Sequence, residues 1–394
     1  MSERRSVATE KLTSLLVNPW EAQYRSLRAE VRDFIDAETL AGNIVRRCDA
    51  WLSGWDEEFS RKLGRRGWIG ITIPVEFGGH GRSALERYVV TEELLAAGAP
   101  VAAHWITDRQ VVPSLLRYGT EFQKRRFLPI IAKGDCYFAI GLSEPDAGSD
   151  LAAVQTRAQR VHGGWLLTGT KLWTSGAHRA HALTVLARSG RRGEGNRHAG
   201  LTQFIVEIPS EGLSIRPIRL LTGEHHFNEV VFEDVFVRDE LVLGGIGDGW
   251  AQVTSELAFE RSGPERWLST FPLFASLIDH LQDEPTCNSD VKQVTGVLAT
   301  RIWVFRQMSM SIAAAIERGE VPNVPSAVVK DAGTRFEGEL IEMIRQLRDF
   351  ESYSDDDGIR SLFESAVTHS PGYTLRGGTN EVLRGVVARA LGVS

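Results

Sequence analysis

The chain has 394 residues, with a hydrophobic content of 42%, a charged content of 24% and a formal net charge of −6. This composition is typical of a soluble globular protein with two or three packed units, and the mildly acidic charge argues against a nucleic-acid or anionic-membrane partner. The three scattered cysteines are too few for a disulfide framework, which indicates a reducing cytoplasm.

Residues 1–135 are expected to form helices. The first residues contain no apolar signal segment and no run approaches a membrane span, so a soluble cytoplasmic protein is predicted. Apolar residues recur at helical spacing over residues 24–35 and again over residues 85–97. The Gly- and Pro-rich segment 67–81 predicts a loop between them. It is not a phosphate-binding loop, because no strand-then-helix unit with GxGxxG spacing surrounds it.

The hydrophobic period changes to about two between Asp135 and Leu243, with turn residues between the runs. Gly163 and Gly164 predict a hairpin, and the segment as a whole predicts a small antiparallel β-barrel or sandwich. The remaining strand candidates are residues 165–168, 182–186, 204–208 and 230–232. A basic loop at 188–200 can meet phosphates, but such charge runs are usually solvated and it is left out of the site.

Helical periodicity returns after residue 249, over residues 250–281, 291–318 and 326–350, with Ser326 as the expected N-cap of the third helix. A final helix is predicted from Asn380 to Leu391. Gly377 and Gly378 precede it and leave free amides at its N-terminus, which suits a pyrophosphate or an electron-rich ring edge. The fold class is therefore α+β. The expected domains are helical (1–135), β (136–243) and a helical bundle (244–394).

The most informative stretch is residues 138–150, FAIGLSEPDAGSD. It begins as an apolar strand and breaks at Ser143, Glu144 and Pro145, after which small residues let the backbone turn sharply. Such a strand end can offer amides to the rim of a flat polar heterocycle. A generic strand-to-turn junction has the same composition, so the residues alone leave both interpretations open.

Five segments together resemble the acyl-CoA dehydrogenase family. In chain order, GWIGI with PVEFGG (67–79) resembles the family pattern G-W-x-G-I…P-x-E-x-G-G, and LSEPDAGSD (142–150) resembles L-[ST]-E-P-x-A-G-S-D. The segment KLWTS (171–175) resembles K-x-W-[IT]-[ST], and FEDVFV (232–237) resembles F-x-D-V-x-V. The last segment, GGT (377–379), resembles E-G-T. The resemblance implies an acyl-CoA dehydrogenase-like fold and the oxidoreductase chemistry of fatty acid metabolism. It also implies FAD, an acyl-CoA substrate, an electron-transfer flavoprotein as partner and a homo- or hetero-oligomer, dimer or tetramer. No metal site is expected, because no CxxC or paired-histidine spacing occurs.

One departure from the family concerns the catalytic base. Removing the α-proton of a thioester needs a carboxylate of limited solvation, and the family often uses the Glu of E-G-T, where this chain has Gly377. Some branches use a Glu on the first long C-terminal helix, and the segment AFER (258–261) resembles that L-x-E-R position. Glu260 is therefore the predicted base, and Arg261 is expected to steer the carboxylate or the thioester. Pro264 should free the Glu260 carbonyl and kink the helix. The alternative is that Glu260 and Arg261 are surface or ion-pair residues.

The resemblance also implies a set of cofactor and substrate contacts. Leu142 and Ser143 would meet the pyrimidine edge of the flavin, and Ser149 would lie nearer the thioester. The residues expected to flank the ring or contact the cofactor elsewhere are Trp173, Thr174, Ser175, Gly378, Thr379 and Glu381. A hydroxyl of this set would reach the hydride-accepting nitrogen. A β-core position is the alternative for Trp173, and the adjacent His225 and His226 are expected to be solvated.

Two further family segments are absent, R-x-x-F-G after Arg266 and the Gly-rich Q-x-x-G-G-x-G before the last helices. The nucleotide half of the flavin is therefore held differently or needs a partner chain. The leading hypothesis is a flavin-dependent acyl-CoA dehydrogenase. The alternatives are a flavin monooxygenase on the same fold and a non-catalytic subunit that completes another chain's cofactor site.

Overall fold

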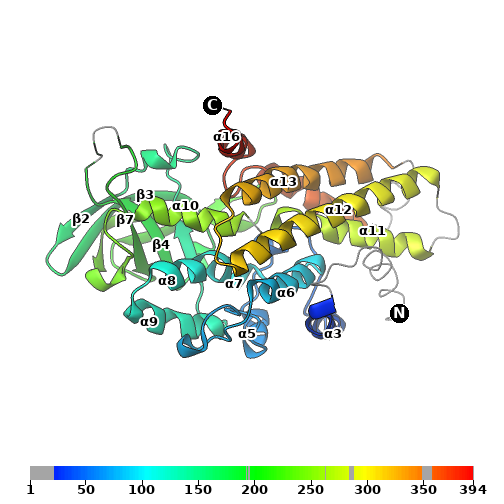
Figure 1. Ribbon diagram of the computed structural model, residues 1–394, viewed down its shortest axis with the longest axis horizontal. Coiled ribbons are helices and arrows are strands. Elements are labelled where there is room, and N and C mark those ends of the chain that lie inside the picture. The colour runs from blue at the N-terminus through cyan, green and yellow to red at the C-terminus, as the bar shows by residue number, and fades with distance from the viewer. Residues whose placement is uncertain are drawn as a thin grey trace.

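The computed structural model describes residues 22–191, 193, 196–261, 263–283, 288–347 and 357–393. The start of the chain, on which the expectation about a signal segment rests, lies outside these ranges. A β-sheet forms one end of the molecule and long helices form the other, with α10 (Gly249–Glu260) between them (Figure 1). Within the described ranges, no helix has both the length and the apolar character needed to cross a membrane.

The described part of the first 135 residues contains helices joined by loops and no strand, as predicted. The apolar side of α3 (Arg25–Leu40) is buried, and α6 (Ala84–Ala96) begins at a capping box formed by Ser83 and Glu86. The predicted loop at 67–81 contains only a single 3-10 turn. The other helices are α4 (Ala50–Ser53), α5 (Glu57–Arg65), α7 (Ala102–Ile106), a π-helical turn (Thr107–Val111), α8 (Val112–Tyr118) and α9 (Glu121–Ala132).

The middle segment forms one twisted sheet in the order β6-β7-β3-β2-β4-β5-β8, with β1 also paired to β4. The predicted hairpin at Gly163 and Gly164 is confirmed by antiparallel pairing of β2 with β3. The sheet is not purely antiparallel, because β1 runs parallel to β4. The strands are β1 (Phe138–Gly141), β2 (Arg157–Val161), β3 (Gly164–Ser175), β4 (Ala182–Arg188), β5 (Leu201–Glu207), β6 (Leu213–Arg219), β7 (His225–Arg238) and β8 (Val242–Leu243).

The C-terminal segment corrects two expectations. The single helix expected over 250–281 is two helices, because the chain leaves helical geometry between Glu260 and Phe271. The helix expected to start at Ser326 begins at Asn323, because Pro325 falls in its first turn, where a missing N–H costs nothing. The elements are α10, α11 (Phe271–Asp283), α12 (Ser289–Glu317), α13 (Asn323–Arg345), α15 (Asp357–Tyr373) and α16 (Asn380–Ala390).

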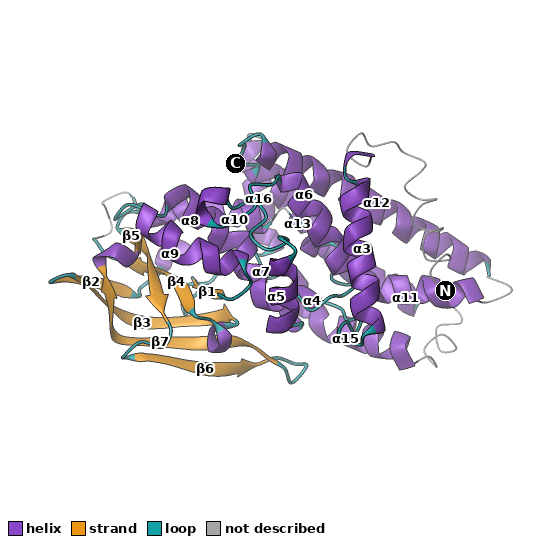
Figure 2. Ribbon diagram, turned by 90° about the horizontal axis from the view of Figure 1, so that it is seen from below, coloured by secondary structure: helices purple, strands orange, loops and turns teal. Residues whose placement is uncertain are grey.

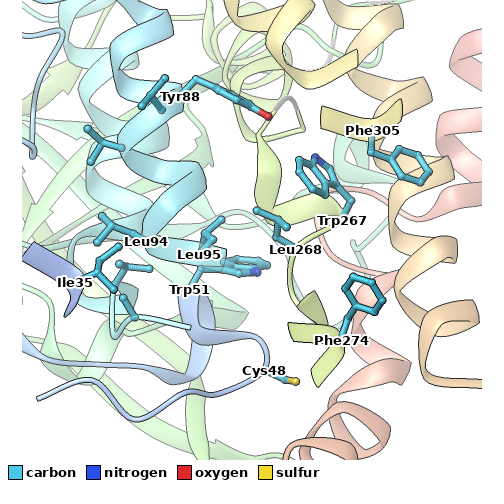
Figure 3. Packing of buried hydrophobic residues seen from close by; sticks show 14 of the residues in the cluster. Ile35, Cys48, Trp51, Tyr88, Leu94, Leu95, Trp267, Leu268, Phe274 and Phe305 are labelled. Carbon is cyan, nitrogen blue, oxygen red and sulfur yellow. The ribbon is translucent and has the colours of Figure 1, made fainter. Parts of the chain in front are cut away.

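Three hydrophobic clusters hold these elements together. The largest joins the N-terminal and C-terminal helices, and Figure 3 shows Trp51 beside Leu95 and Leu268 within it. A second lies between the sheet and helices α8 and α9, which cover one face of the sheet (Figure 2). The third packs Val253 of α10 against Ala147 in the loop after β1. Helix α10 is therefore fixed against the segment that carries the main sequence motif.

Candidate active site

A buried ion pair shapes the loop that follows β1. Glu144 accepts hydrogen bonds from the backbone N–H of Gln155 at 2.7 Å and of Thr156 at 2.9 Å, and from Lys171 Nζ at 2.8 Å. Lys171 also donates to the carbonyl of Leu142 at 3.0 Å. Burial lowers the pKa of Lys171 to about 8 despite the favourable charge of Glu144. Both residues lie within the sequence motifs, but neither was included among the predicted site residues.

The strand end has the open backbone that the sequence predicted. Ser143 uses its carbonyl to accept the N–H of Leu172 at 2.9 Å, while its own N–H makes no hydrogen bond within the described ranges. The side chain of Leu142 packs on the cluster around Val253. Ser149 is exposed at the far end of the loop. An amide at the rim and an exposed hydroxyl further along are therefore both available to a ligand.

The basic loop after β4 is partly structural, which corrects the expectation that it is solvated. Arg188 donates to the carbonyls of Ala152, Val154 and Ala199 at 2.8–3.2 Å. The next part of the loop stacks His198 on Trp250 of α10, with ring centroids 3.9 Å apart. It therefore braces the motif loop against α10.

The end of β3 presents one aromatic ring and two hydroxyls. Trp173 is 55% exposed, with a left-handed backbone at φ +59°, so the alternative of a core position is wrong. Thr174 is fully buried, and its hydroxyl has no hydrogen-bond partner among the described residues. Ser175 lines a cavity. An exposed indole next to an unpartnered buried hydroxyl is the kind of surface that a flavin ring can use.

Glu260 is the last residue of α10 and is held by a single arginine. Arg266 Nη2 lies 3.0 Å from Glu260 Oε1, and the same guanidinium donates to the Glu260 carbonyl from Nε at 3.2 Å and from Nη2 at 3.1 Å. The carboxylate is 17% exposed, while Arg266 is 2% exposed. The prediction that Pro264 frees this carbonyl is confirmed, and the helix ends there instead of kinking. Glu260 is therefore a largely buried carboxylate in an ion pair, so the surface part of the alternative is wrong and the ion-pair part agrees with the structure.

Gly377, at the position where the resemblance implies a catalytic Glu, lies directly beside Glu260. A Cβ placed on Gly377 would be 3.1 Å from Glu260 Oε1 and 3.0 Å from Arg266 Nη2. The residue has φ +71°, a region that favours glycine. The two alternative positions for a base, 260 and 377, therefore converge on one point in this fold.

Cationic side chains hold the loop that contains Gly377. Arg261 Nε donates to the Gly377 carbonyl at 2.8 Å. Lys330 donates to the carbonyls of Thr374 and Gly378 at 2.9 and 2.8 Å and to Asn380 Oδ1 at 2.7 Å. Burial lowers the pKa of Lys330 to about 7. The loop is thereby fixed next to Glu260 without a carboxylate of its own.

The same loop leaves its amides open, as the sequence predicted. In the described part of the chain, the N–H groups of Gly377, Gly378 and Thr379 make no hydrogen bond. Thr379 is the N-cap of α16 and accepts the N–H of Val382 at 3.4 Å. Glu381 is exposed in the first helical turn, where backbone and Thr379 hydrogen bonds lower its pKa. These free amides at a helix N-terminus fit an anionic part of a flavin nucleotide.

A buried charge network anchors the residue before the glycines. Arg376 Nη1 donates to Asp49 Oδ1 at 3.1 Å and to Oδ2 at 2.8 Å, and His369 Nδ1 lies 3.2 Å from Asp49 Oδ2. On its other side, His369 Nε2 lies 3.3 Å from Glu224, which also binds His226 at 3.0 Å. Burial opposes the charge on His369, but both carboxylates raise its pKa, to about 9. The expectation that the His225–His226 pair is solvated is wrong.

A second carboxyl group lies one helical turn before Glu260. Glu256 is buried and accepts a hydrogen bond from Gln203 Nε2 at 3.1 Å. Burial, with a contribution from the charge of Glu260, raises the pKa of Glu256 to about 8, so this carboxyl is neutral at pH 7. Sequence reasoning missed Glu256, although its i, i+4 spacing to Glu260 places both on one helical face. It also missed Arg266, Lys330, Asp49, His369 and Arg376.

A cavity of about 190 Å³ lies between α4, α7 and the ends of β3 and β7. Of the predicted site residues only Ser175 lines it. Trp51 forms another wall, and the guanidinium carbons of Arg266 and Arg376 lie 5.3 and 4.5 Å from the Trp51 ring centroid. Glu260 does not line the cavity, but its partner Arg266 packs on the cavity wall.

Family models for the N-terminal, middle and C-terminal domains of acyl-CoA dehydrogenases match residues 21–135, 139–235 and 247–392. The chain is 33% identical to acyl-CoA dehydrogenase IpdE1 of Mycobacterium tuberculosis, over 93% of this chain and 97% of that protein. It is 34% identical to acyl-CoA dehydrogenase FadE34 of the same organism over 79% of this chain, and spans 43% of that longer protein.

Solved structures show the same fold. The Tcur3481-Tcur3483 steroid ACAD is 29% identical, with a TM-score of 0.82 over 95% of this chain and 98% of that one. The ChsE4-ChsE5 complex from Mycobacterium tuberculosis is 28% identical, with a TM-score of 0.76 over 96% of this chain and 99% of the other. The predicted order of helices, sheet and helical bundle is therefore confirmed.

Proposed function

The chain belongs to the acyl-CoA dehydrogenase family of enzymes, and from this premise we propose that it dehydrogenates an acyl-CoA thioester between its α and β carbons to give a 2-enoyl-CoA. The observation that carries the proposal is the position of the Glu260 carboxylate beside Gly377, where many relatives are expected to have their base. FAD, when bound, supplies the acceptor for the β-hydride.

In this mechanism Glu260 takes the α-proton. Arg266 binds Oε1 and the carbonyl of Glu260, which orients the carboxylate, while Oε2 makes no hydrogen bond within the described ranges. Oε2 is therefore the atom proposed to receive the proton. Arg261 is proposed to act through the loop, because its guanidinium binds the Gly377 carbonyl. General-base catalysis of this kind contributes roughly 10²–10⁴-fold to the rate.

The cofactor contacts follow from the free groups of the site. The open amide at Ser143 and the neighbouring Leu142 are proposed for the pyrimidine edge, and Trp173 with Thr174 and Ser175 for the ring. The amides of Gly378 and Thr379, with Glu381 close by, are proposed for the nucleotide end. Ser149 is proposed to lie nearer the thioester. Each assignment places an unpartnered or exposed group of this chain against a polar part of the ligand.

A second subunit is proposed to complete the site. This chain lacks both family segments expected to contact the dinucleotide, and the similar ChsE4-ChsE5 structure is described as a complex of two proteins. A cytoplasmic dimer or tetramer, homomeric or heteromeric, is proposed, with an electron-transfer flavoprotein as the electron acceptor. One similar structure is described as a steroid ACAD, which favours a bulky ring-bearing acyl group over a simple fatty acyl chain.

The test is the visible spectrum of the purified protein, alone and with candidate partner chains, before and after a panel of acyl-CoA thioesters. A flavin band that bleaches with a thioester and returns with electron-transfer flavoprotein supports the proposal. A yellow protein that no thioester reduces contradicts it, and rapid oxygen consumption with a reductant would favour the monooxygenase. Flavin that appears only with a partner chain, and reduction that does not depend on Glu260, would favour the non-catalytic subunit.

A further inference from the structure

We propose that the 190 Å³ cavity is the pocket for the far end of the acyl group, and that it selects a ring carrying a carboxylate through Arg47 and Arg179. This inference deepens the proposed function and rests on it, because it names the class of acyl group that the dehydrogenase accepts.

The walls of the cavity suit a ring. Trp51 and Trp55 provide flat apolar faces, and the remaining apolar lining comes from Leu52, Ala102, Ala103, Ile106 and Phe138. Aromatic and aliphatic walls bind a ring by burying its apolar surface. A protein cavity of about 150 Å³ can hold benzene, so 190 Å³ has room for one six-membered ring with a short substituent.

Two arginines at this cavity have no carboxylate partner in the described part of the chain. The Arg47 Nε atom is buried without a hydrogen bond, and its Nη1 reaches only the Ser53 carbonyl at 3.5 Å. The Arg179 guanidinium lies over the Trp55 ring, 5.5 Å from its centroid, and is otherwise exposed at the rim. By contrast, the adjacent Arg46 donates to Asp279 at 2.9 Å. Unpaired guanidinium groups at a cavity are a ready site for a carboxylate, which they bind bidentately.

The other ionisable groups at the cavity leave its charge positive at neutral pH. Among the described residues, no aspartate or glutamate lines it. Burial, with a contribution from His225, lowers the pKa of His178 to about 4, so this ring is neutral. His226 is bound to Glu224, which also binds His369 and is not among the residues that line the cavity. Arg47 and Arg179 therefore carry the uncompensated charge of the lining.

The position of the cavity connects it to the proposed reaction centre. Ser175, which is proposed to contact the flavin ring, lines one wall. Trp51 forms another and packs against Arg266, the residue that holds Glu260 (Figure 3 shows Trp51 in its core). An acyl group with its α-carbon at Glu260 is proposed to extend past Arg266 and Trp51 towards this cavity. A tail with an anionic end would then reach the arginines.

The test uses two CoA thioesters that differ in one group, 3-cyclohexylpropanoyl-CoA and its 4-carboxycyclohexyl analogue. Their affinities for the flavin-loaded protein, with any partner chain it needs, are measured by calorimetry, and flavin bleaching is followed in parallel. We expect the carboxylated thioester to bind at least tenfold more tightly. In Arg47→Met and in Arg179→Met this preference should fall towards unity, with the neutral thioester little changed, while Arg46→Met keeps the wild-type preference.

Several results would overturn the inference. Equal binding of the two thioesters, or an undiminished preference in Arg47→Met and Arg179→Met, would show that the arginines do not read a carboxylate. Loss of flavin from either variant, with its fold intact by circular dichroism, would assign the cavity to the cofactor. If both thioesters bleach the flavin with no preference for the carboxylated one, only this inference fails. If none bleaches it, the proposed function fails, and calorimetry still decides whether the cavity recognises the carboxylate.

Discussion

The loop after β1 and the cluster around Glu260 are both proposed to serve one reaction, but they are built differently. This cluster, called the corner below, comprises Glu260, the glycine loop at 374–379 and the charged residues that bind them. The loop is held by residues near in sequence, since Lys171 and Glu144 are 27 positions apart. The corner is assembled from residues far apart, with 116 positions between Arg261 and Gly377 and 327 between Asp49 and Arg376. A local motif can be read directly from a sequence, whereas an assembled corner becomes visible only when the chain folds.

The two regions also differ in how charge is compensated. The loop has one buried ion pair, and the same carboxylate accepts two backbone N–H groups. At the corner, four cations hold a glycine loop and two carboxylates, Glu260 and Asp49; the cations are Arg261, Arg266, Lys330 and Arg376. The loop should therefore depend on one interaction and the corner on a distributed set.

The largest effect is expected from Lys171→Met in the loop. The substitution leaves the Glu144 charge buried without its partner, which should cost about 3–5 kcal/mol of unfolding free energy. Urea unfolding and flavin content measure the result. The double variant Lys171→Met/Glu144→Gln should recover part of the loss, because Gln keeps an acceptor oxygen without the charge. A cost below about 1 kcal/mol for the single variant would contradict a loop that depends on this pair.

At the corner, Asp49→Asn should cost less, about 2 kcal/mol, because Arg376 loses a charged acceptor while other cations still hold the loop. Asparagine tolerates the left-handed backbone at φ +54°, so the change tests charge alone. Asp331→Asn is the matched control, since it weakens ion pairs with Arg335 and Arg384, whose side chains are about half exposed on the same bundle, and it should cost under about 1 kcal/mol. Equal losses of unfolding free energy in the two variants would contradict a special role of Asp49.

The pH dependence of stability tests the same network at smaller amplitude. Asp49 and Glu224 raise the folded-state pKa of His369 to about 9, so its stabilisation is complete below pH 6.5 and is lost as pH rises through about 9. The difference in unfolding free energy between wild type and His369→Gln should therefore be about 1–2 kcal/mol at pH 6, shrink as pH rises from 6.5 to about 9, and be largely lost above that. A difference that does not change with pH would show that His369 is not charged in the network.

The smallest effect is expected from the glycine itself. Gly377→Ala should destabilise the protein by about 1–2 kcal/mol, because the residue has φ +71° and the new Cβ would crowd Glu260 and Arg266. Gly338→Ala, in the interior of α13 with open space around it, should instead stabilise it by about 0.4–1 kcal/mol. Thermal unfolding of both variants compares the two glycines. If Gly377→Ala stabilised the protein as much as Gly338→Ala does, the space around Gly377 would have to be larger than the structure shows.

The sequence predicted the fold well because hydrophobic period and turn residues are local signals. The helix over 85–97, the hairpin at Gly163 and Gly164 and the final helix from Asn380 follow from such signals and are confirmed. The parallel pairing of β1 with β4 was not predictable in this way, because it depends on a contact between segments more than forty residues apart.

Sequence patterns named candidate residues, but they did not show the burial that decides the chemistry of those residues. Pro264 predicted a kink at Glu260, where the structure has the end of α10, and the missing Glu at 377 led to the proposal of Glu260 as the base. Nothing local shows that Glu256 is buried and neutral or that Arg266 holds Glu260, since exposure and ion pairing depend on elements packed from elsewhere. The pocket residue Arg47 is likewise separated by more than 120 positions from Ser175, across the same cavity.

The central claim, that Glu260 is the base, is tested most directly by comparing two carboxyl groups one helical turn apart. The rate of flavin bleaching by a reducing thioester is measured by stopped flow for wild type, Glu260→Gln and Glu256→Gln. Loss of a general base should slow Glu260→Gln by roughly 10²–10⁴-fold, while Glu256→Gln, which replaces a neutral carboxyl by a neutral amide, should stay within about threefold of wild type. A fast Glu260→Gln variant, or a slow Glu256→Gln with Glu260→Gln unaffected, would contradict the account.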